Sequence, residues 1–192
     1  SVPFDMESAA VSFHAQAGEK SSKKVDVVAA VAPLEVVGRY EAPFRAANLH
    51  PGWVTTSTLA ALQLIPPVGL KVLAKRTGRI LTITVIDSGK IRLVRTIETG
   101  DTNAQEIVGH LFPTFAYVED ELSARPETLL LCGFEAEDDS FRGLLQGELG
   151  VPVAPLTSRV GTPGEFNAGL LGYLESLEEM LPIDDSQRQP FQ

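Results

Sequence analysis

Apolar and polar positions at the start of the chain follow a pattern typical of two β-strands. Residues 10–14 alternate, residues 25–31 are β-branched and mostly apolar, and the polar run 18–22 between them predicts a turn. The nearly continuous apolar run of the second segment indicates a buried strand. We therefore expect an antiparallel pair whose second strand is the more buried.

A helical pattern follows this pair. Pro33 suits the first turn of a helix, and apolar residues recur at helical spacing up to Ala47. Asn48 is the predicted end of this helix. Because Pro43 lacks a backbone N–H, it should kink or shorten the helix.

A short strand at residues 53–55 and a helix over 57–64, with Ser57 as its N-cap, complete a first predicted subdomain, residues 1–65. Two adjacent prolines within residues 66–70 end this helix and stiffen the chain beyond it. We interpret residues 66–70 as a Pro-rich linker between two small subdomains.

The clearest local pattern in the second part is a β-hairpin. Residues 80–86 and 90–97 are rich in β-branched and apolar side chains. Asp87, Ser88 and Gly89 lie between them and form a turn sequence that contains glycine. This hairpin is the predicted start of a second β-sheet.

Helices and short strands alternate after the hairpin. Asn103 and Glu106 form a helix-capping pattern. One apolar stripe follows at helical spacing: Ile107, Leu111, Phe115, Val118 and Leu122. The remaining predicted elements are a buried strand at 128–133, a helix at 141–149, a short strand at 151–153 and a final helix at 165–180. Their order predicts an α/β (α+β) fold with mixed sheets and helices packed on them.

The composition agrees with a globular protein. Of the 192 residues, 44% are hydrophobic and 21% are charged, as in domains that bury a core. The net charge of -9 disfavours a general affinity for nucleic-acid phosphates. The single Cys132 excludes an intramolecular disulfide and a cysteine-based zinc site. We expect neither a membrane span nor a secretory leader.

Positive charge gathers in one region of this acidic chain. Seven basic residues lie from Lys71 to Arg95, and Asp87 is the only acidic residue among them. Such a patch can receive an acidic segment of a partner protein. The alternative is a solvated strand face that pairs with the protein's own acidic helices.

The common catalytic motifs are missing from the sequence. It contains no GxxxxGK[ST], HExxH, GxSxG, CxxC or EF-hand pattern. No carboxylate or second histidine completes a site with His14, His50 or His110, so we interpret them as structural or exposed. Cys132 follows three leucines and is expected to be an inert buried thiol. The acidic residues within 135–139 could hold a hard cation, or could simply favour a helix N-terminus. We predict no catalytic residue and no metal site.

Four stretches of the chain follow one another in an order that is typical of one protein family. They are Val2-Pro3-Phe4-Asp5 with residues 10–13, residues 25–30 with 36–49, the hairpin Asp87-Ser88-Gly89-Lys90-Ile91-Arg92 with residues 93–97, and Leu129-Leu130-Leu131-Cys132-Gly133 with residues 149–153 and 166–172. Together they resemble the PilM family of type IV pilus assembly proteins. That family belongs to the actin-like ATPase superfamily and is related to the cytoplasmic part of the type II secretion protein GspL.

The resemblance implies two small subdomains that are parts of an actin-like (ribonuclease H-like) fold. Residues 1–65 would form an insertion subdomain of the first half, and residues 71–181 a core subdomain of the second half. Residues 182–192 would form a flexible tail. The first-half core with its own phosphate loop is absent from these residues, and whether the natural chain extends before Ser1 stays open.

The positions that bind ATP in this superfamily are altered here. Where the resemblance implies the aspartate and the threonine of a DxGxxxT phosphate loop, the chain has Lys75 and Leu81. The vestigial phosphate-loop positions are Gly78, Gly100, Asp101 and Gly133. In the two places where the family has paired glycines, Asp101 and Phe134 replace the second glycine and would crowd a phosphate.

These departures predict a non-catalytic, PilM-like scaffold protein of a type IV pilus or type II secretion platform, cytoplasmic and held at the inner membrane through its partners. The implied partner is the short cytoplasmic N-terminal segment of a PilN-like inner-membrane protein, and self-association is also implied. No cofactor is expected. The alternative is part of a nucleotide-binding actin-like ATPase, with ATP and magnesium, whose other half lies outside this chain. An enzyme of another class would need a pocket with converging polar groups.

Overall fold

The computed structural model describes residues 5–16, 25–100, 103–134 and 139–180. Contacts divide the chain into two compact units, Ser1–Thr55 and Thr56–Gln192. The division falls before the predicted linker at residues 66–70. The predicted turn at 18–22 and the predicted tail at 182–192 lie outside the described residues.

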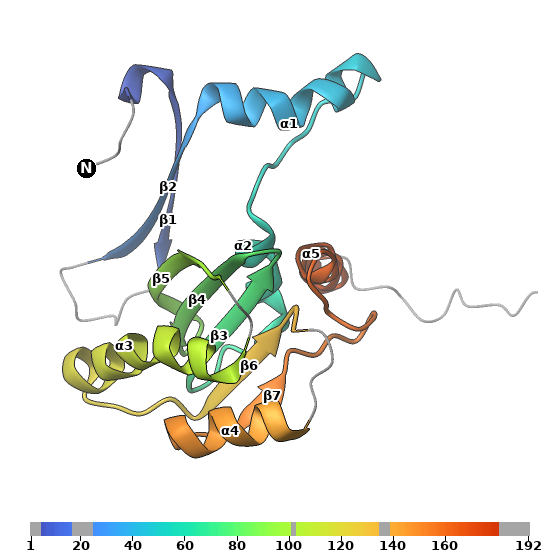
Figure 1. The fold of residues 1–192 in the computed structure, drawn as a ribbon. Helices are drawn as coiled ribbons and strands as arrows, with labels where there is room; N and C mark the ends of the chain where they lie inside the picture. Colours follow the sequence, from blue (N-terminus) through green and yellow to red (C-terminus); the bar gives the residue numbers. More distant parts are fainter. Residues whose placement is uncertain (1–4, 17–24, 101–102, 135–138, 181–192) are drawn as a thin grey trace, which may run out of the picture. The chain divides into compact units, whose positions relative to one another are not determined.

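The first unit consists of a β-hairpin followed by a helix (Figure 1). Its elements are a short 3-10 helix η1 (Met6–Ser8), β1 (Ala9–Gln16), β2 (Asp26–Pro33) and α1 (Leu34–Ala46). β1 and β2 pair antiparallel along their whole length, as the sequence predicts. α1 continues through Pro43 to Ala46, so this proline does not end the helix. Residues 53–55, predicted as a strand, form none.

The first unit has no hydrophobic core among its described residues. None of its apolar side chains is buried there, so the expectation of a buried β2 is wrong. One face of the hairpin is nevertheless entirely apolar: Ala9, Val11, Phe13 and Ala15 lie opposite Pro33, Val31, Ala29 and Val27. On this face Phe13 is 76% exposed. Because an isolated hairpin that buries little apolar surface is marginally stable, this unit is suited to packing against another surface.

The second unit is built on a five-stranded mixed sheet with the order β5-β4-β3-β6-β7. Its elements are α2 (Ser57–Ala61), a short 3-10 helix η2 (Leu62–Leu64), β3 (Leu70–Thr77), β4 (Ile80–Asp87), β5 (Lys90–Glu98), α3 (Ala104–Leu122), β6 (Thr128–Cys132), α4 (Asp139–Leu149), β7 (Val153–Pro155) and α5 (Ala168–Met180). The first three strands are antiparallel, whereas β6 runs parallel to β3 and β7 parallel to β6. This arrangement confirms the predicted α/β fold with a mixed sheet.

The central strand, β3, is absent from the sequence prediction. A central strand is buried on both faces and usually appears as an unbroken apolar run, but here Lys71, Lys75 and Arg76 interrupt the run. The structure buries Lys75 together with the apolar residues of this strand. Because of these charged positions, the sequence pattern did not predict the strand at the centre of the sheet.

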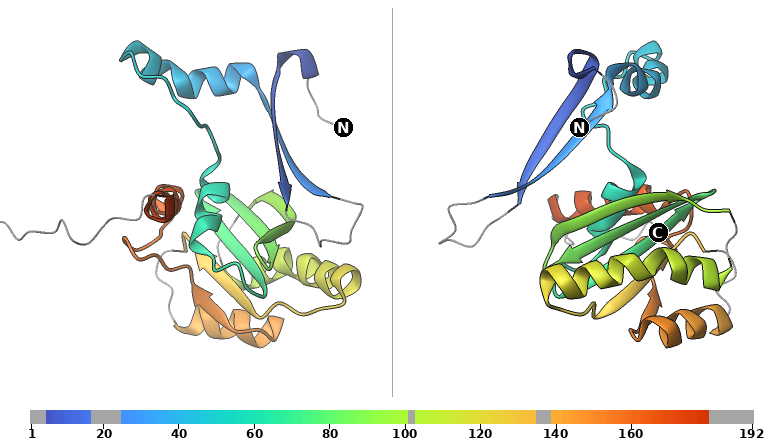
Figure 2. Two further views of the ribbon diagram at one scale, coloured as in Figure 1. Left: turned by 180° about the vertical axis from the view of Figure 1, so that it is seen from behind. Right: turned by 60° about the vertical axis from the view of Figure 1, so that its left-hand side comes forward.

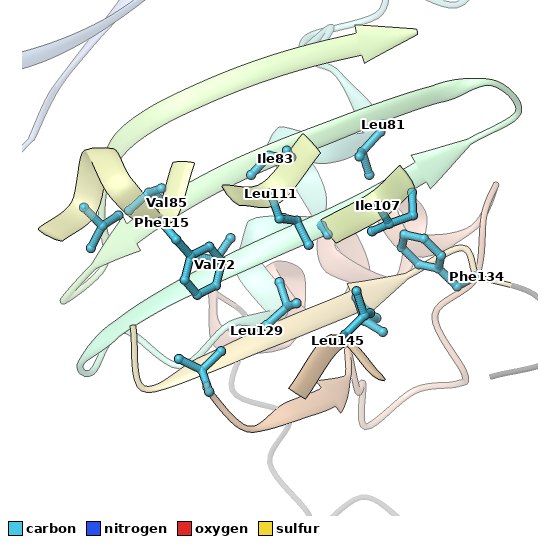
Figure 3. Close-up of a cluster of buried hydrophobic side chains, with 14 of the residues drawn as sticks. Val72, Leu81, Ile83, Val85, Ile107, Leu111, Phe115, Leu129, Phe134 and Leu145 are labelled. Atoms are coloured by element: carbon cyan, nitrogen blue, oxygen red, sulfur yellow. The ribbon is translucent and has the colours of Figure 1, made fainter. Parts of the chain in front are cut away.

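Helices cover both faces of this sheet (Figure 2). α3 and α4 lie on one face, and α2 and α5 lie on the other. The larger cluster of buried side chains lies under α3 and α4 and includes Val72, Leu81, Ile83, Ile107, Leu111, Leu129 and Leu145 (Figure 3). Four residues of the predicted stripe of α3, namely Ile107, Leu111, Phe115 and Val118, belong to it. No helix in the described part of the chain is long and apolar enough to cross a membrane.

On the other face, α2 and α5 pack so closely that their backbones nearly touch. A Cβ atom added to Gly172 of α5 would lie 2.1 Å from the Ala60 carbonyl oxygen of α2, and one added to Gly169 would lie 2.8 Å from the Ser57 Cα. Ala60 and Ala61 are buried. This helix pair ties α2 to the second unit, which explains why the division falls after Thr55.

Candidate functional site

Three of the predicted phosphate-loop positions lie at one end of the five-stranded sheet. Gly78 is in the turn between β3 and β4, Gly100 follows β5, and Gly133 follows β6. Since β4 runs antiparallel to both β3 and β5, while β6 runs parallel to β3, these strand ends share one edge. Asp101 lies outside the described residues. That these positions derive from a phosphate loop stays a prediction.

A buried lysine lies in β3, two residues before the end of the strand. Lys75 is 1% exposed, and its Nζ donates to the Thr77 Oγ1 at 2.6 Å and to the Glu165 backbone carbonyl at 3.3 Å. Burial lowers the pKa of Lys75, while the charges of Cys132 and Glu165 act in the opposite direction. The resemblance implies a metal-handling aspartate at this place, whereas the side chain present is a cation, which would repel Mg²⁺.

The Glu165 carboxylate lies against the same turn. The Gly78 backbone N–H donates to this carboxylate, and the Thr77 hydroxyl donates to the Glu165 carbonyl at 3.4 Å. Glu165 is therefore attached to the end of β3 through both its side chain and its backbone.

The sequence prediction did not identify Glu165 as part of a site. It placed this residue at the start of the last helix, which is wrong, because α5 begins at Ala168 and Glu165 belongs to the preceding loop. A glycine- and proline-containing loop before the helix is the only local signal. The hydrogen bond from Lys75 to Glu165 spans 90 positions of the chain, so no spacing rule could have found it.

Gly133 lets three backbone segments meet at this edge. Its φ is +78°, and an added Cβ would lie 2.3 Å from the Arg76 carbonyl oxygen and 3.0 Å from the Glu165 Cα. Any side chain would therefore collide with β3 and with the Glu165 loop. The glycine that the resemblance relates to phosphate binding here makes room for the protein's own chain.

Gly100 also meets a carboxylate of the same chain. Its N–H donates to the Glu106 Oε1 at 3.0 Å, and the Glu106 N–H donates to the Asn103 Oδ1 at 2.9 Å, which confirms the predicted capping pattern. His110 lies near the same carboxylate, with its Nε2 3.5 Å from the Glu106 Oε1. Two glycine amides at this edge are thus each paired with an internal glutamate.

The remaining candidate groups are the acidic cluster at residues 135–139 and the thiol of Cys132. Most of the acidic cluster at residues 135–139 lies outside the described residues, and Asp139 begins α4 and pairs with Arg142 at 2.6 Å. In the ranges that the structure describes, no group of three His, Cys, Asp or Glu side chains could hold a metal ion. Cys132 is buried at the end of β6, and its Sγ lies 3.5 Å from the Gly164 carbonyl oxygen.

Part of the positive region from Lys71 to Arg95 is paired within the chain. Lys75 is buried, Arg92 pairs with Asp87 at 2.9 Å, and Arg79 lies 3.6 Å from Glu98. The two acidic partners, Asp87 and Glu98, lie on strands β4 and β5 and not on the helices that were predicted to supply them. A site for an acidic partner segment stays a prediction.

The buried state of Lys75 predicts a pH-dependent stability. Because its pKa is lowered by burial from 10.5, the unfolded chain holds this proton more firmly than the folded chain does. As pH rises from the lowered value towards 10.5, the wild type should gain stability relative to Lys75→Met, by at most about 1.4 kcal/mol per pH unit. Urea unfolding of both proteins at several pH values measures this difference, and a constant difference would contradict the assignment.

Comparison with known proteins supports the fold. No protein-family model and no curated protein matches the chain. Its structure is similar to that of the PilM-PilN type IV pilus biogenesis complex, with a TM-score of 0.70 and 16% identity over 91% of this chain and 68% of that one. It is also similar to a Bacteroides thetaiotaomicron protein with an actin-like ATPase fold and unknown function, with a TM-score of 0.52 and 14% identity over 87% of this chain and 60% of that one. The chain therefore has the fold of actin-like ATPase-fold proteins.

Proposed function

We propose that this protein is a PilM-like interaction protein that acts as a scaffold in a type IV pilus or type II secretion assembly platform. The observation that carries the proposal is the first unit, which exposes apolar surface and has no core among its described residues. Such surfaces mark sites of contact with other proteins. In this role the protein is cytoplasmic and reaches the inner membrane through its partners.

The partner is the short cytoplasmic N-terminal segment of a PilN-like inner-membrane protein. The structural similarity covers most of this chain and is to a complex of PilM with PilN. Because the identity is 16%, the similarity establishes the fold, and the partner rests on this proposal. Self-association of the chain is the competing use of the same surface.

Two surfaces of the first unit are suited to such a contact. One is the apolar face of the hairpin, where Val11, Phe13 and Val27 are exposed. The other is a stripe on α1, where Val36, Tyr40 and Phe44 recur every fourth residue and are exposed. Between α1 and β1 lies a hollow lined by Ala10, Leu34, Val37, Gly38, Glu41, Ala42 and Arg45.

The site at the end of β3 supports a role without ATPase activity. Lys75 is a buried cation where an ATPase would carry a metal-handling carboxylate, and Glu165 pairs with the Gly78 amide. Nucleotide binding by an ATPase of which this chain is one part is the alternative. It predicts that Mg-ATP raises the melting temperature, because a ligand bound only by the native state stabilises it. An unchanged melting temperature at millimolar Mg-ATP would remove this alternative.

Binding of the PilN-like N-terminal segment tests the scaffold proposal. We expect the segment, made as a fluorescent peptide, to bind the full chain, and we expect Phe13→Ser or Tyr40→Ser to weaken binding by about tenfold or more, as for buried aromatic contacts. Phe112→Ser is the matched control, because Phe112 is 63% exposed in the second unit. Absence of binding by a folded wild-type chain, or equal loss in all three variants, would contradict the proposal.

A further inference from the structure

The outer edge of β1 lacks the features that usually prevent a strand edge from pairing. In the described part of the chain, β1 has a strand partner on one side only, which is β2 (Figure 1). Proteins normally protect such edges with charged side chains, prolines or very short strands. β1 is eight residues long and contains no lysine, arginine, aspartate, glutamate, proline or glycine. Its outer edge is therefore suited to pairing with another strand.

The five-stranded sheet shows that this chain protects its other strand edges. One outer strand of that sheet is β5, which carries four charged residues, Lys90, Arg92, Arg95 and Glu98. The other outer strand is β7, which has only three residues and ends in Pro155. Both devices discourage the addition of a further strand. The unprotected edge of β1 is the exception among the outer strands of the two sheets that the structure describes.

We propose that β1 pairs antiparallel with β1 of a second copy of this chain, so that two hairpins form one four-stranded sheet about a twofold axis. A two-stranded hairpin is marginally stable by itself, whereas three or more strands with an apolar face can form a stable sheet. The contact uses the backbone edge of the hairpin and leaves its apolar face open. It is therefore independent of the partner segment proposed above.

The side chains of β1 fit a second copy of the same strand. Directly opposite residues of an antiparallel pair point to the same side of the sheet. With Ser12 on the twofold axis, Val11 of each copy lies opposite Phe13 of the other, which is a favourable pairing of a β-branched with an aromatic side chain. The apolar face then continues from one hairpin to the next. A shift by one residue would instead place the apolar face of one hairpin beside the polar face of the other.

The distribution of charge also favours a contact through the first unit. The whole chain has a net charge of -9, but residues 1–55 contain five basic and six acidic residues. Residues 56–192 contain 11 basic and 19 acidic residues. Two copies therefore repel each other less through the first unit than through the second. No lysine, arginine, aspartate or glutamate lies at the paired positions 9–15.

Cysteine cross-linking of the full chain tests the register. Opposite residues in an antiparallel pair have Cα atoms about 4.5–5.5 Å apart, which a disulfide can span. Ser12→Cys should therefore form a disulfide-linked dimer under mild oxidation, seen on a non-reducing gel. His14→Cys is the matched control, because His14 is also exposed in β1, but its two copies would lie four positions apart along the strands, about 13 Å. The natural Cys132 is buried and is the same in both variants.

Sedimentation equilibrium of the full chain measures the dimer without any cross-link. Ser12→Lys should weaken the dimer by at least about tenfold, because it places two like charges directly opposite each other at the twofold axis. Ala30→Lys is the matched control, since Ala30 is the β2 partner of Ser12, is exposed and does not lie at the outer edge of β1. It should leave the dissociation constant within about threefold of the wild type, because its charge lies one strand away from the axis.

Three results would overturn the proposal. The first is a wild-type chain that stays monomeric at concentrations up to about 1 mM. The second is equal cross-linking of Ser12→Cys and His14→Cys, or none of Ser12→Cys. The third is an equal loss of dimer in Ser12→Lys and Ala30→Lys. Circular dichroism shows that each variant is folded, and no measurement uses the PilN-like segment, so failure here leaves the partner proposal unaffected.

Discussion

Replacing Gly133 by alanine is expected to destabilise the second unit strongly, by about 3 kcal/mol or more. Two effects add. The backbone at this residue has a φ of +78°, and the new Cβ would lie 2.3 Å from the Arg76 carbonyl oxygen, which belongs to a rigid central strand. The Glu165 backbone lies on the other side at 3.0 Å, so neither neighbour can move away without breaking hydrogen bonds at the end of β3.

Gly150→Ala is the matched control for this substitution. Gly150 also has a positive φ, +68°, but no atom lies within 4 Å of an added Cβ. Its replacement should therefore cost about 1 kcal/mol, from backbone strain alone. Urea unfolding, followed by circular dichroism, measures both differences. Equal losses at the two positions would contradict the close approach of β3, Gly133 and the Glu165 loop.

Leu111→Ala should be the second strongly destabilising change, with a loss of about 2–5 kcal/mol. Leu111 is completely buried and lies among Ile83, Ile107 and Leu129 in the cluster under α3 (Figure 3). Its truncation removes apolar contacts and leaves a cavity between α3 and the sheet. The strands that border this cavity are held in place by the backbone hydrogen bonds of the sheet. The surrounding residues can therefore fill the cavity only in part.

The next residue along α3 provides the control. Phe112 is 63% exposed, so Phe112→Ala should change the free energy of unfolding by less than about 0.5 kcal/mol, as is usual for surface positions. Both variants are compared by urea unfolding of the full chain. A small effect of Leu111→Ala, or a large effect of Phe112→Ala, would contradict the orientation of α3 on the sheet.

Local physics made most elements of the second unit predictable. The Asn103 cap and the stripe on α3 occur as expected, because capping and one-sided burial depend on residues three or four positions apart. The hairpin from β4 to β5 was predictable because its turn sequence, residues 87–89, lies directly between the two strands. The strand β3 escaped prediction because burial of Lys75 depends on Thr77 and on the distant Glu165.

The candidate site was predictable in part. The sequence pointed to Gly78, Gly100 and Gly133, and the topology brings these three to one edge of the sheet. It could not show that Glu165 and Glu106 meet the Gly78 and Gly100 amides. The contacts of Glu165 with the β3–β4 turn depend on where the loop before α5 lies relative to the sheet. No local sequence pattern predicts that position.

By itself, the sequence determined the hairpin of β4 and β5, the mixed α/β fold class and the apolar stripe of α3, since each rests largely on interactions between residues near one another in the chain. Only the tertiary structure decided that β3 is the central strand, that Lys75 is buried, and that Glu165 contacts the end of β3. It also decided that the apolar hairpin in residues 9–33 lacks a core of its own among the described residues. An apolar pattern predicts that a face will be covered, but only the packed chain shows whether the same unit covers it.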